Sequence, residues 1–215
     1  MDYQPPMDPY LDVVYQDDDV LVLNKPSGLL SVPGRQEIHK DSLQSRAQVQ
    51  FPSATTVHRL DMETSGLIVM ALHKDAHRHL SSQFENRLVK KRYIARVFGH
   101  LSDRQGEVNV PLICDWPNRP RQKVDFEHGK QALTYWRVLD FEKQTTLVEL
   151  KPVTGRSHQL RVHMLSLGHP IVGDRLYATG DALNGFDCLH LHSHELSFKH
   201  PSKNENMGFS AEANF

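Results

Sequence analysis

Short strand-like segments separated by Gly and Pro dominate this chain and restrict the folds that it can form. The apolar run Val20–Leu23 is typical of a buried strand, and Pro26-Ser27-Gly28 predicts a turn after it. A second apolar run follows Gly66. Together with the alternating segments, these patterns predict strands over 19–25, 55–60, 67–72, 91–98, 132–141, 145–150 and 188–199, with a hairpin turn at 142–144.

Only two segments have the spacing of an amphipathic helix. In 74–88, apolar residues recur every four positions, at Ala76, Leu80, Phe84 and Leu88. The second helix is expected from about Ser157, a candidate N-cap, to Leu167, with Gly168 as its left-handed stop. It would turn Leu160, Met164 and Leu167 toward the core. Many short strands with few helices predict an α+β fold rather than a doubly wound sheet.

The 215 residues contain no Pro/Gly/Ser-rich linker, so we expect a single domain over 1–215 with residues 1–10 as a loose tail. The first residues carry neither a basic region nor an apolar region of a secretory signal, and no apolar run approaches the roughly 20 residues of a membrane helix. We therefore expect a cytoplasmic protein. Cys114 and Cys188 are too few for a disulfide framework or a cysteine metal site and are expected to be free thiols.

The formal net charge of −1 conceals an uneven distribution of charged residues. Residues 1–24 contain six Asp and no Lys or Arg, so much of the negative charge lies at one end. Basic residues gather in 87–96, which contains no acid, and again at Arg119, Arg121 and Lys123. Each cluster alone is equally well explained as a solvated surface. Together they predict a localised RNA-binding groove.

The segment 58–67, His-Arg-Leu-Asp-Met-Glu-Thr-Ser-Gly-Leu, has the layout of a catalytic loop. Its carboxylate, Asp61, follows an Arg at the end of a predicted strand and precedes a turn-forming Thr-Ser-Gly, and such loops present reactive groups on a rigid scaffold. The alternative is a plain turn in which Asp61 caps local backbone donors.

The same segment resembles the signature H-R-L-D-x-x-T-S-G-L loop of the RluA family of RNA pseudouridine synthases. The resemblance continues, in the family's order, through four further blocks. These are Asn24-Lys25-Pro26-Ser27-Gly28-Leu29, Lys90–Ala95, Thr154–His163 and Gly168–Asp174. The segment Leu112–Pro120 resembles the branch of the family that modifies both 23S ribosomal RNA and transfer RNA.

This resemblance implies a pseudouridine synthase fold: a mixed, mostly antiparallel sheet with flanking helices around a central RNA-binding cleft. It implies an RNA uridine isomerase that needs no cofactor and no metal, because the reaction adds and removes nothing. The expected substrates are stem-loops of tRNA, at the anticodon, and of 23S rRNA. Many relatives carry an N-terminal S4 domain, for which this chain leaves no room. We expect a monomer without an obligatory protein partner and without membrane binding.

By resemblance, Asp61 is the catalytic residue, and three roles stay open for it. It could attack C1′ of the ribose, remove a ribose proton or attack C6 of the ring. The resemblance also assigns Arg161 as the cation that keeps Asp61 ionised, Tyr93 as the aromatic ring that stacks on the target base, and Arg59 as the residue that fills the space of a flipped uridine.

Arg156 and Lys151 are expected to contact phosphate or ribose, with a solvated surface as the alternative. The sequence His190-Leu191-His192-Ser193-His194 could ligate zinc from one strand face and so support a hydrolase, but it reads more simply as a core strand. An RNA-folding chaperone without chemistry would use the same cleft.

Overall fold

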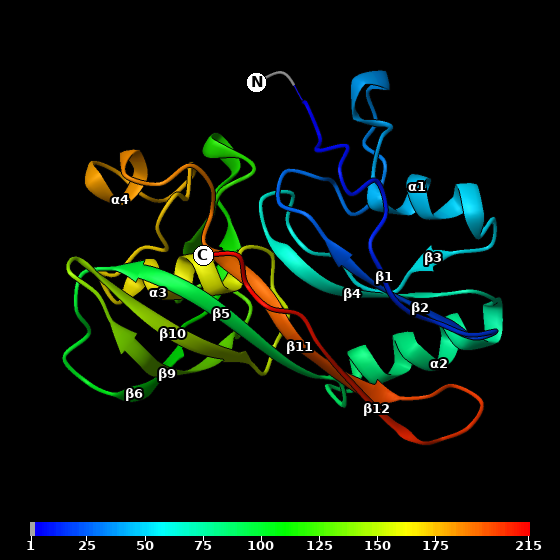
Figure 1. Ribbon diagram of the computed structural model, residues 1–215. Helices are drawn as coiled ribbons and strands as arrows, with labels where there is room; N and C mark the ends of the chain where they lie inside the picture. The colour runs from blue at the N-terminus through cyan, green and yellow to red at the C-terminus, as the bar shows by residue number, and fades with distance from the viewer. Residues whose placement is uncertain (1–2) are drawn as a thin grey trace. The chain divides into compact units, whose positions relative to one another are not determined.

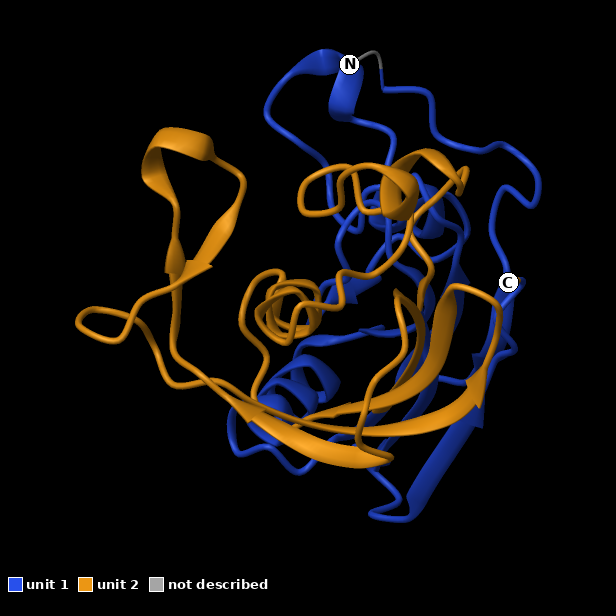
Figure 2. Ribbon diagram, turned by 90° about the vertical axis from the view of Figure 1, so that its left-hand side faces the viewer, with its two compact units in different colours: residues 1–91, 192–214 blue, residues 92–191, 215 orange. Residues whose placement is uncertain are grey.

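The computed structural model describes residues 3–215, and the chain divides into two compact units (Figures 1 and 2). Unit 1 comprises residues up to Lys91 together with 192–214, and unit 2 comprises 92–191 together with Phe215. No helix in the described residues is long and apolar enough to cross a membrane. Each unit contains a largely antiparallel sheet and a few helices, so the predicted α+β class is confirmed.

The sheet of unit 1 has the order β1-β2-β4-β11-β12. Its strands are β1 (Val13–Gln16), β2 (Val20–Lys25), β4 (Ser65–Ala71), β11 (Leu191–Lys199) and β12 (Asn206–Ser210), and the two-residue β3 (Thr55–Thr56) pairs with the end of β4. Neighbouring strands are antiparallel except β4 and β11, which pair in parallel at Ser65 and Gly66. Strands β1 and β12 have no counterpart in the predictions.

The core of unit 1 forms around β2 and β4, because both strands are apolar on both faces. Val20–Leu23 and 67–71 have no exposed surface. Helix α2 (Lys74–Glu85) adds Ala76 and Leu80 to this core. The predicted helix is thus confirmed, but it ends three residues early, since Arg87 adopts a left-handed conformation with φ of 58°. Leu88 is therefore 64% exposed instead of buried.

Two shorter helical segments and the first residues complete unit 1. Helix α1 (Leu43–Gln50) begins at Ser42, whose side chain forms a capping box with Ser45, and a 3-10 turn (Glu37–His39) precedes it. Arg46 on α1 is buried and donates to the carbonyl of Pro6, while the Tyr3 hydroxyl donates to the Asp41 carbonyl. These bonds anchor part of the segment 3–10, for which the sequence suggested a loose tail.

The sheet of unit 2 has the order β5-β10-β9-β6, with antiparallel pairing throughout. Its strands are β5 (Lys90–Phe98), β10 (Thr145–Pro152), β9 (Leu133–Phe141) and β6 (Gln105–Asn109). The predicted strand over 91–98 and the hairpin of β9 and β10 are confirmed. A separate hairpin joins β7 (Leu112–Cys114) to β8 (Gln122–Val124) through a 3-10 turn (Trp116–Asn118).

Helix α3 (Gln159–Ser166) lies against β10 and β8, and the short α4 (Asp181–Asn184) follows later in the chain. The prediction of Ser157 as N-cap is wrong. The cap residue is His158, in a left-handed conformation, and the Gln159 side chain accepts the Arg156 N–H upstream of the helix. Leu160 and Met164 are buried as expected, but Leu167 lies beyond the last helical residue and is 36% exposed. Gly168, with φ of +82°, ends the segment as predicted.

Candidate functional site

The loop that carries Asp61 comprises residues 58–67. At its start, the side chain of His58, and not the strand backbone, bonds to β4 of the unit 1 sheet. His58 Nε2 accepts the backbone N–H of Val69 at 3.1 Å, and the ring stacks on Phe84 with centroids 4.4 Å apart. Burial, aided by the nearby charge of Lys91, lowers the pKa of His58 to about 3, so the ring stays neutral and can accept this bond. The predicted strand over 55–60 is therefore only two residues long, because Val69 on β4 donates to the His58 side chain instead of to a backbone carbonyl of that strand.

Segment 25–31 holds the backbone of the Asp61 loop from one side. Ser31 Oγ accepts the N–H of Leu60 at 3.1 Å and donates to its carbonyl at 2.7 Å. Ser27 Oγ donates to the carbonyl of Glu63 at 2.7 Å. The N–H of Gly28 and the Nζ of Lys25 both donate to the carbonyl of Met62, each at 2.9 Å. The residues on both sides of Asp61 are thus fixed through their backbone.

Gly66 closes the loop at a point where only glycine fits. Its φ is +106°, and a Cβ built on it would lie 2.4 Å from the carbonyl oxygen of Ser193. The neighbouring Ser65 hydroxyl lies 2.9 Å from Nδ1 of the buried His192, whose Nε2 lies 3.0 Å from the carbonyl oxygen of Ala211. Strand β11 therefore determines where the loop re-enters the sheet.

In unit 2, Arg161 is buried on α3 and pairs with a buried carboxylate. Its Nε and one terminal nitrogen donate to the two carboxylate oxygens of Asp174, both at 2.7 Å, and the side chains are only 4% and 1% exposed. The guanidinium carbon also lies 5.2 Å from the centroid of the Tyr177 ring. A bidentate pair of this kind fixes the plane of the guanidinium.

Tyr93 and Lys151 lie on adjacent strands, but their side chains point to opposite faces of the sheet. Tyr93 is 9% exposed and faces Leu150 across the β5–β10 pair, and Lys151 is the next residue on β10. Lys151 Nζ lies 2.8 Å from the buried carboxylate of Glu149, which Arg92 and Arg137 also contact. Burial opposes ionisation of Glu149, yet the hydrogen bonds from Lys151 and Arg92 lower its pKa.

The remaining predicted contacts lie on loops. Arg59 is exposed in the Asp61 loop, and Arg156 donates from Nε to the carbonyl of Gln131 at 3.1 Å. In unit 2, the β7–β8 hairpin presents Trp116, which is 65% exposed, with the Arg119 guanidinium 4.5 Å from its ring centroid. Arg121 lies over Tyr177 at 5.4 Å. The hairpin therefore combines an exposed aromatic ring with the predicted basic cluster.

Asp61 and Arg59 thus belong to unit 1, while Tyr93, Lys151, Arg156 and Arg161 belong to unit 2. Sequence reasoning missed the residues that hold these groups. Ser27, Ser31 and Asp174 stand within or beside the blocks of the resemblance, but nothing in their local pattern distinguishes a loop-holding hydroxyl or a buried carboxylate from a turn residue.

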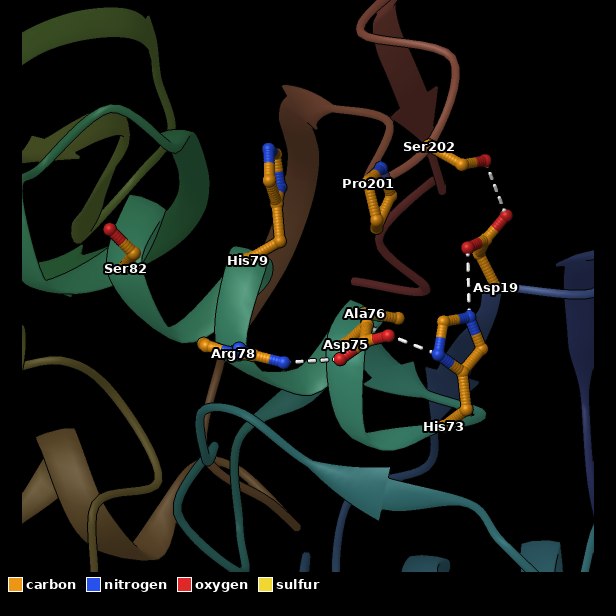
Figure 3. Close-up of a pocket in the computed structure, with 9 residues that line it drawn as sticks. All are labelled: Asp19, His73, Asp75, Ala76, Arg78, His79, Ser82, Pro201 and Ser202. Carbon is orange, nitrogen blue, oxygen red and sulfur yellow. Dashed lines mark hydrogen bonds and ion pairs between the residues drawn. The ribbon is translucent and has the colours of Figure 1, made fainter.

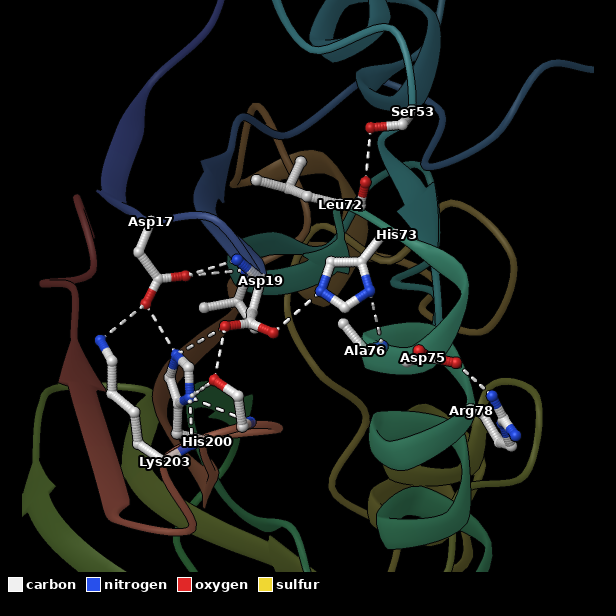
Figure 4. A network of polar contacts seen from close by, with 12 residues as sticks. Asp17, Asp19, Ser53, Leu72, His73, Asp75, Ala76, Arg78, His200 and Lys203 are labelled. Atoms are coloured by element: carbon white, nitrogen blue, oxygen red, sulfur yellow. Dashed lines mark hydrogen bonds and ion pairs between the residues drawn. The ribbon is translucent and has the colours of Figure 1, made fainter.

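A cavity of about 470 Å³ in unit 1 lies at the start of α2 and is lined by Asp19, Pro201 and Ser202 from other segments (Figure 3). Beside it, Asp17, Asp19 and His200 form the only cluster with metal-ligand spacing among residues 3–215 (Figure 4). The Nδ1 of His200 accepts the N–H groups of Ser202 and Lys203, so its proton lies on Nε2, which donates to Asp17 at 2.7 Å. A metal ligand would need the lone pair of that nitrogen. These contacts fasten the β11–β12 turn to the β1–β2 turn.

The hydrogen bonds of β11 do not support the hypothesis that the histidines of 190–194 ligate zinc. His192 and His194 both direct a ring nitrogen to the carbonyl oxygen of Ala211, at 3.0 and 2.6 Å. His190, in unit 2, stacks on Phe215 with centroids 4.5 Å apart. The strand is a core strand whose imidazoles position the segment after β12.

Comparison with known proteins defines the class to which this fold and these blocks belong. Residues 19–166 match a family model described as RNA pseudouridylate synthase. The chain is similar in structure to human RNA pseudouridylate synthase domain containing 1, with a TM-score of 0.82 and 30% identity, over 99% of this chain and 87% of that one. The chain therefore belongs to the RNA pseudouridylate synthase family, which confirms the predicted fold and reaction class.

Within this family, the chain resembles one kind of enzyme over nearly its whole length. It is 56% identical over 214 residues to the dual-specificity RNA pseudouridine synthase RluA of Salmonella typhimurium, covering 99% of this chain and 98% of that protein. The protein of the same name from Pasteurella multocida is 56% identical over 210 residues, covering 97% of this chain and 96% of that protein.

Proposed function

We propose that this isomerase converts uridine to pseudouridine in structured stem-loops of two RNA classes, the anticodon arm of tRNA and 23S rRNA. The observation that carries the proposal is the 56% identity to dual-specificity enzymes over 99% of the chain. The exposed Trp116, Arg119 and Arg121 on the β7–β8 hairpin support RNA binding, because an aromatic ring and guanidinium groups suit stacked bases and phosphates.

In this proposal Asp61 is the catalytic residue and Tyr93 stacks on the target base. Arg161, with its plane fixed by Asp174, keeps Asp61 ionised, and Arg59 occupies the space left by the flipped uridine. Arg156 is assigned to the RNA backbone. We assign Lys151 to phosphate instead of the target uridine, because its side chain leaves β10 on the face opposite Tyr93.

The chain acts as a single catalytic domain and a monomer in the cytoplasm, without a cofactor, a metal or an obligatory protein partner. Unlike hydrolysis or redox chemistry, the isomerisation has no group to add or remove, so the RNA alone supplies every reacting atom. Activity that survives exhaustive chelation would support this part of the proposal, and activity lost on chelation and restored by zinc would refute it.

The test is tritium release from RNA labelled at C5 of uridine, because C5 loses its hydrogen only when the new glycosidic bond forms. We expect release from both an anticodon stem-loop and a 23S rRNA fragment, and none from either with Asp61→Asn. Glu63→Gln, in the same loop, serves as the matched control and should retain release. Release from one RNA alone would restrict the proposal to that class. If the wild type binds both RNAs but releases tritium from neither, an RNA chaperone becomes the better reading.

A further inference from the structure

The β7–β8 hairpin, which presents Trp116 and Arg119, is a separate two-stranded sheet of unit 2. In the part of the chain that the structure describes, its strands pair with each other and not with the β5-β10-β9-β6 sheet. A two-stranded hairpin is only marginally stable by itself. The base of the hairpin is fixed, because Leu112 and Lys130 exchange two backbone hydrogen bonds, at 2.8 and 3.0 Å. The position of its outer half therefore depends on contacts with the rest of unit 2.

Tyr177 supplies such a contact. Its hydroxyl accepts the backbone N–H of Gln122 at 2.7 Å, at the end of β8 that is nearer the Trp116 turn. The same hydroxyl lies 2.7 Å from Nδ1 of His158, the cap residue of α3. A hydroxyl can accept one hydrogen bond and donate another, so this oxygen joins the backbone of the hairpin to the start of α3.

The ring of Tyr177 connects the hairpin to Arg161 in a second way. It is only 6% exposed, and two guanidinium groups lie near its centroid, that of Arg121 on the hairpin at 5.4 Å and that of Arg161 at 5.2 Å. The backbone N–H of Tyr177 donates at 3.2 Å to the Asp174 carboxylate, which also holds Arg161. The hairpin and the buried arginine therefore share one support.

The hydroxyl of Tyr177 does something that packing alone does not require. The ring belongs to an apolar cluster with Leu112 of β7 and Val162 of α3, and a phenylalanine would fill the same space. It would, however, leave the N–H of Gln122 without its acceptor. Removal of the hydroxyl thus separates the support of the hairpin from the packing of the cluster.

We propose that Tyr177 is a positioning residue for RNA recognition, whose hydroxyl holds the outer half of the β7–β8 hairpin in its RNA-binding position. The inference rests on the proposed function, in which Trp116, Arg119 and Arg121 bind RNA. The apparent affinity falls with the fraction of the protein in the binding-competent arrangement, so a hairpin that is less often in place binds more weakly. Removal of the hydroxyl leaves the ring beside Arg161, and the chemical step should be spared.

The experiment compares Tyr177→Phe with Tyr135→Phe on the anticodon stem-loop. Tyr135 is the matched control, since it lies on β9 of the same unit and is 46% exposed. We expect Tyr177→Phe to raise the RNA dissociation constant by about tenfold, the effect of losing one hydrogen bond whose donor stays unsatisfied. Its single-turnover rate constant at saturating RNA should change by less than about threefold. Tyr135→Phe should change neither quantity.

A double-mutant cycle tests whether the effect of Tyr177 passes through the hairpin. The background for the cycle is a variant with both Trp116→Ala and Arg119→Ala, in which the hairpin has lost two of its proposed RNA contacts. There, Tyr177→Phe should raise the dissociation constant by less than about threefold, because little binding is left for the hairpin to place. A residue with only a general structural role would weaken binding by the same factor in both backgrounds.

Amide hydrogen exchange gives a readout that needs no RNA. Tyr177→Phe should speed exchange at Gln122, which loses its acceptor, and at Asp115, whose N–H donates to the carbonyl of Arg121 across the hairpin. Strands β9 and β10 should keep wild-type protection, since the ring that packs on unit 2 is retained.

The outcomes separate this inference from the proposed function. Wild-type affinity or wild-type exchange at Gln122 in Tyr177→Phe overturns the positioning role, and so does an equal loss of affinity in both backgrounds of the cycle. A loss of rate at saturating RNA without a loss of affinity also overturns it, since it would place the hydroxyl in the chemical step. If the wild type binds neither RNA, the proposed function fails, and the exchange measurement still decides whether the hydroxyl holds the hairpin.

Discussion

Replacing Gly66 with Ala should destabilise unit 1 more than the same substitution at Gly28, which lies in the same unit and also has a positive φ. Two separate costs apply at this position. An L-residue at φ of +106° is strained by about 1–3 kcal/mol. The new Cβ would also lie 2.4, 2.5 and 2.8 Å from the oxygen, nitrogen and carbon of Ser193, so the backbone of β11 must move, which adds about 1–3 kcal/mol.

The two costs together give an expected loss of about 4 kcal/mol for Gly66→Ala, or roughly 8–16 °C in Tm for a chain of this size. Relief by movement of β11 is limited, because the Ser193 hydroxyl donates to the carbonyl of Leu67 at 3.0 Å. The unfolding midpoint should be followed by far-UV circular dichroism. Both tryptophans, Trp116 and Trp136, lie in unit 2, so their fluorescence does not report on unit 1.

Gly28→Ala is the matched control for this prediction. Gly28 belongs to the same unit and has φ of +85°, but a Cβ there would meet only the Pro6 side chain at an ordinary 3.6 Å. It should therefore show the backbone cost alone, about 1–3 kcal/mol. Equal destabilisation by the two substitutions would refute the reasoning, since it would mean that the contact with Ser193 adds nothing.

Two other perturbations test the electrostatics of the fold. Burial lowers the pKa of His58 to about 3 and of His163 to about 4, so the folded state binds fewer protons than the unfolded state below pH 6.5, and stability must fall as the pH drops. Between pH 7 and 5 the loss should be about 2 kcal/mol per histidine in urea titrations. A free energy of unfolding that does not change with pH would contradict this. Arg46→Met should lower the free energy of unfolding by about 3 kcal/mol, because it leaves the Asp41 carboxylate and the Pro6 carbonyl without a buried partner. The control Arg78→Met breaks only an exposed ion pair with Asp75 and should change this free energy by less than about 0.5 kcal/mol. Similar midpoints for both arginine variants in thermal unfolding would show that burial of the Arg46 pair contributes nothing.

Strong local patterns predicted the strands and helix that form the centre of each unit. The apolar run of β2 and the four-residue spacing of apolar residues in α2 could be recognised because the side chains in these patterns are the ones that become buried. Strands β1 and β12 were not predicted, because each is short and mostly exposed and so has no clear hydrophobic pattern. They form because they pair with β2 and β11. Leu88 continued the helical spacing beyond the helix, but the left-handed Arg87 ends that spacing.

The Asp61 loop could be found from the sequence, but the residues that hold it could not. Asp61 is marked by the turn signals around it and by resemblance. The contacts of Lys25 and Ser31 with the loop span 37 and 29 positions, and no local pattern distinguishes them from a surface lysine and a turn serine. The contact that His58 makes could not be predicted either, because its bond to Val69 depends on how β3 departs from β4.

Three buried cations differ in a way that bears on their purpose. Arg46 and Arg161 each face a carboxylate in a bidentate pair, which offsets the cost of removing both charges from water. Lys25 faces carbonyl oxygens, whose partial charges offset less of that cost. An apolar side chain of similar size would avoid the cost but would leave the Met62 carbonyl without its ammonium donor. The least compensated cation of unit 1 thus contacts the carbonyl of Met62, the residue that follows Asp61.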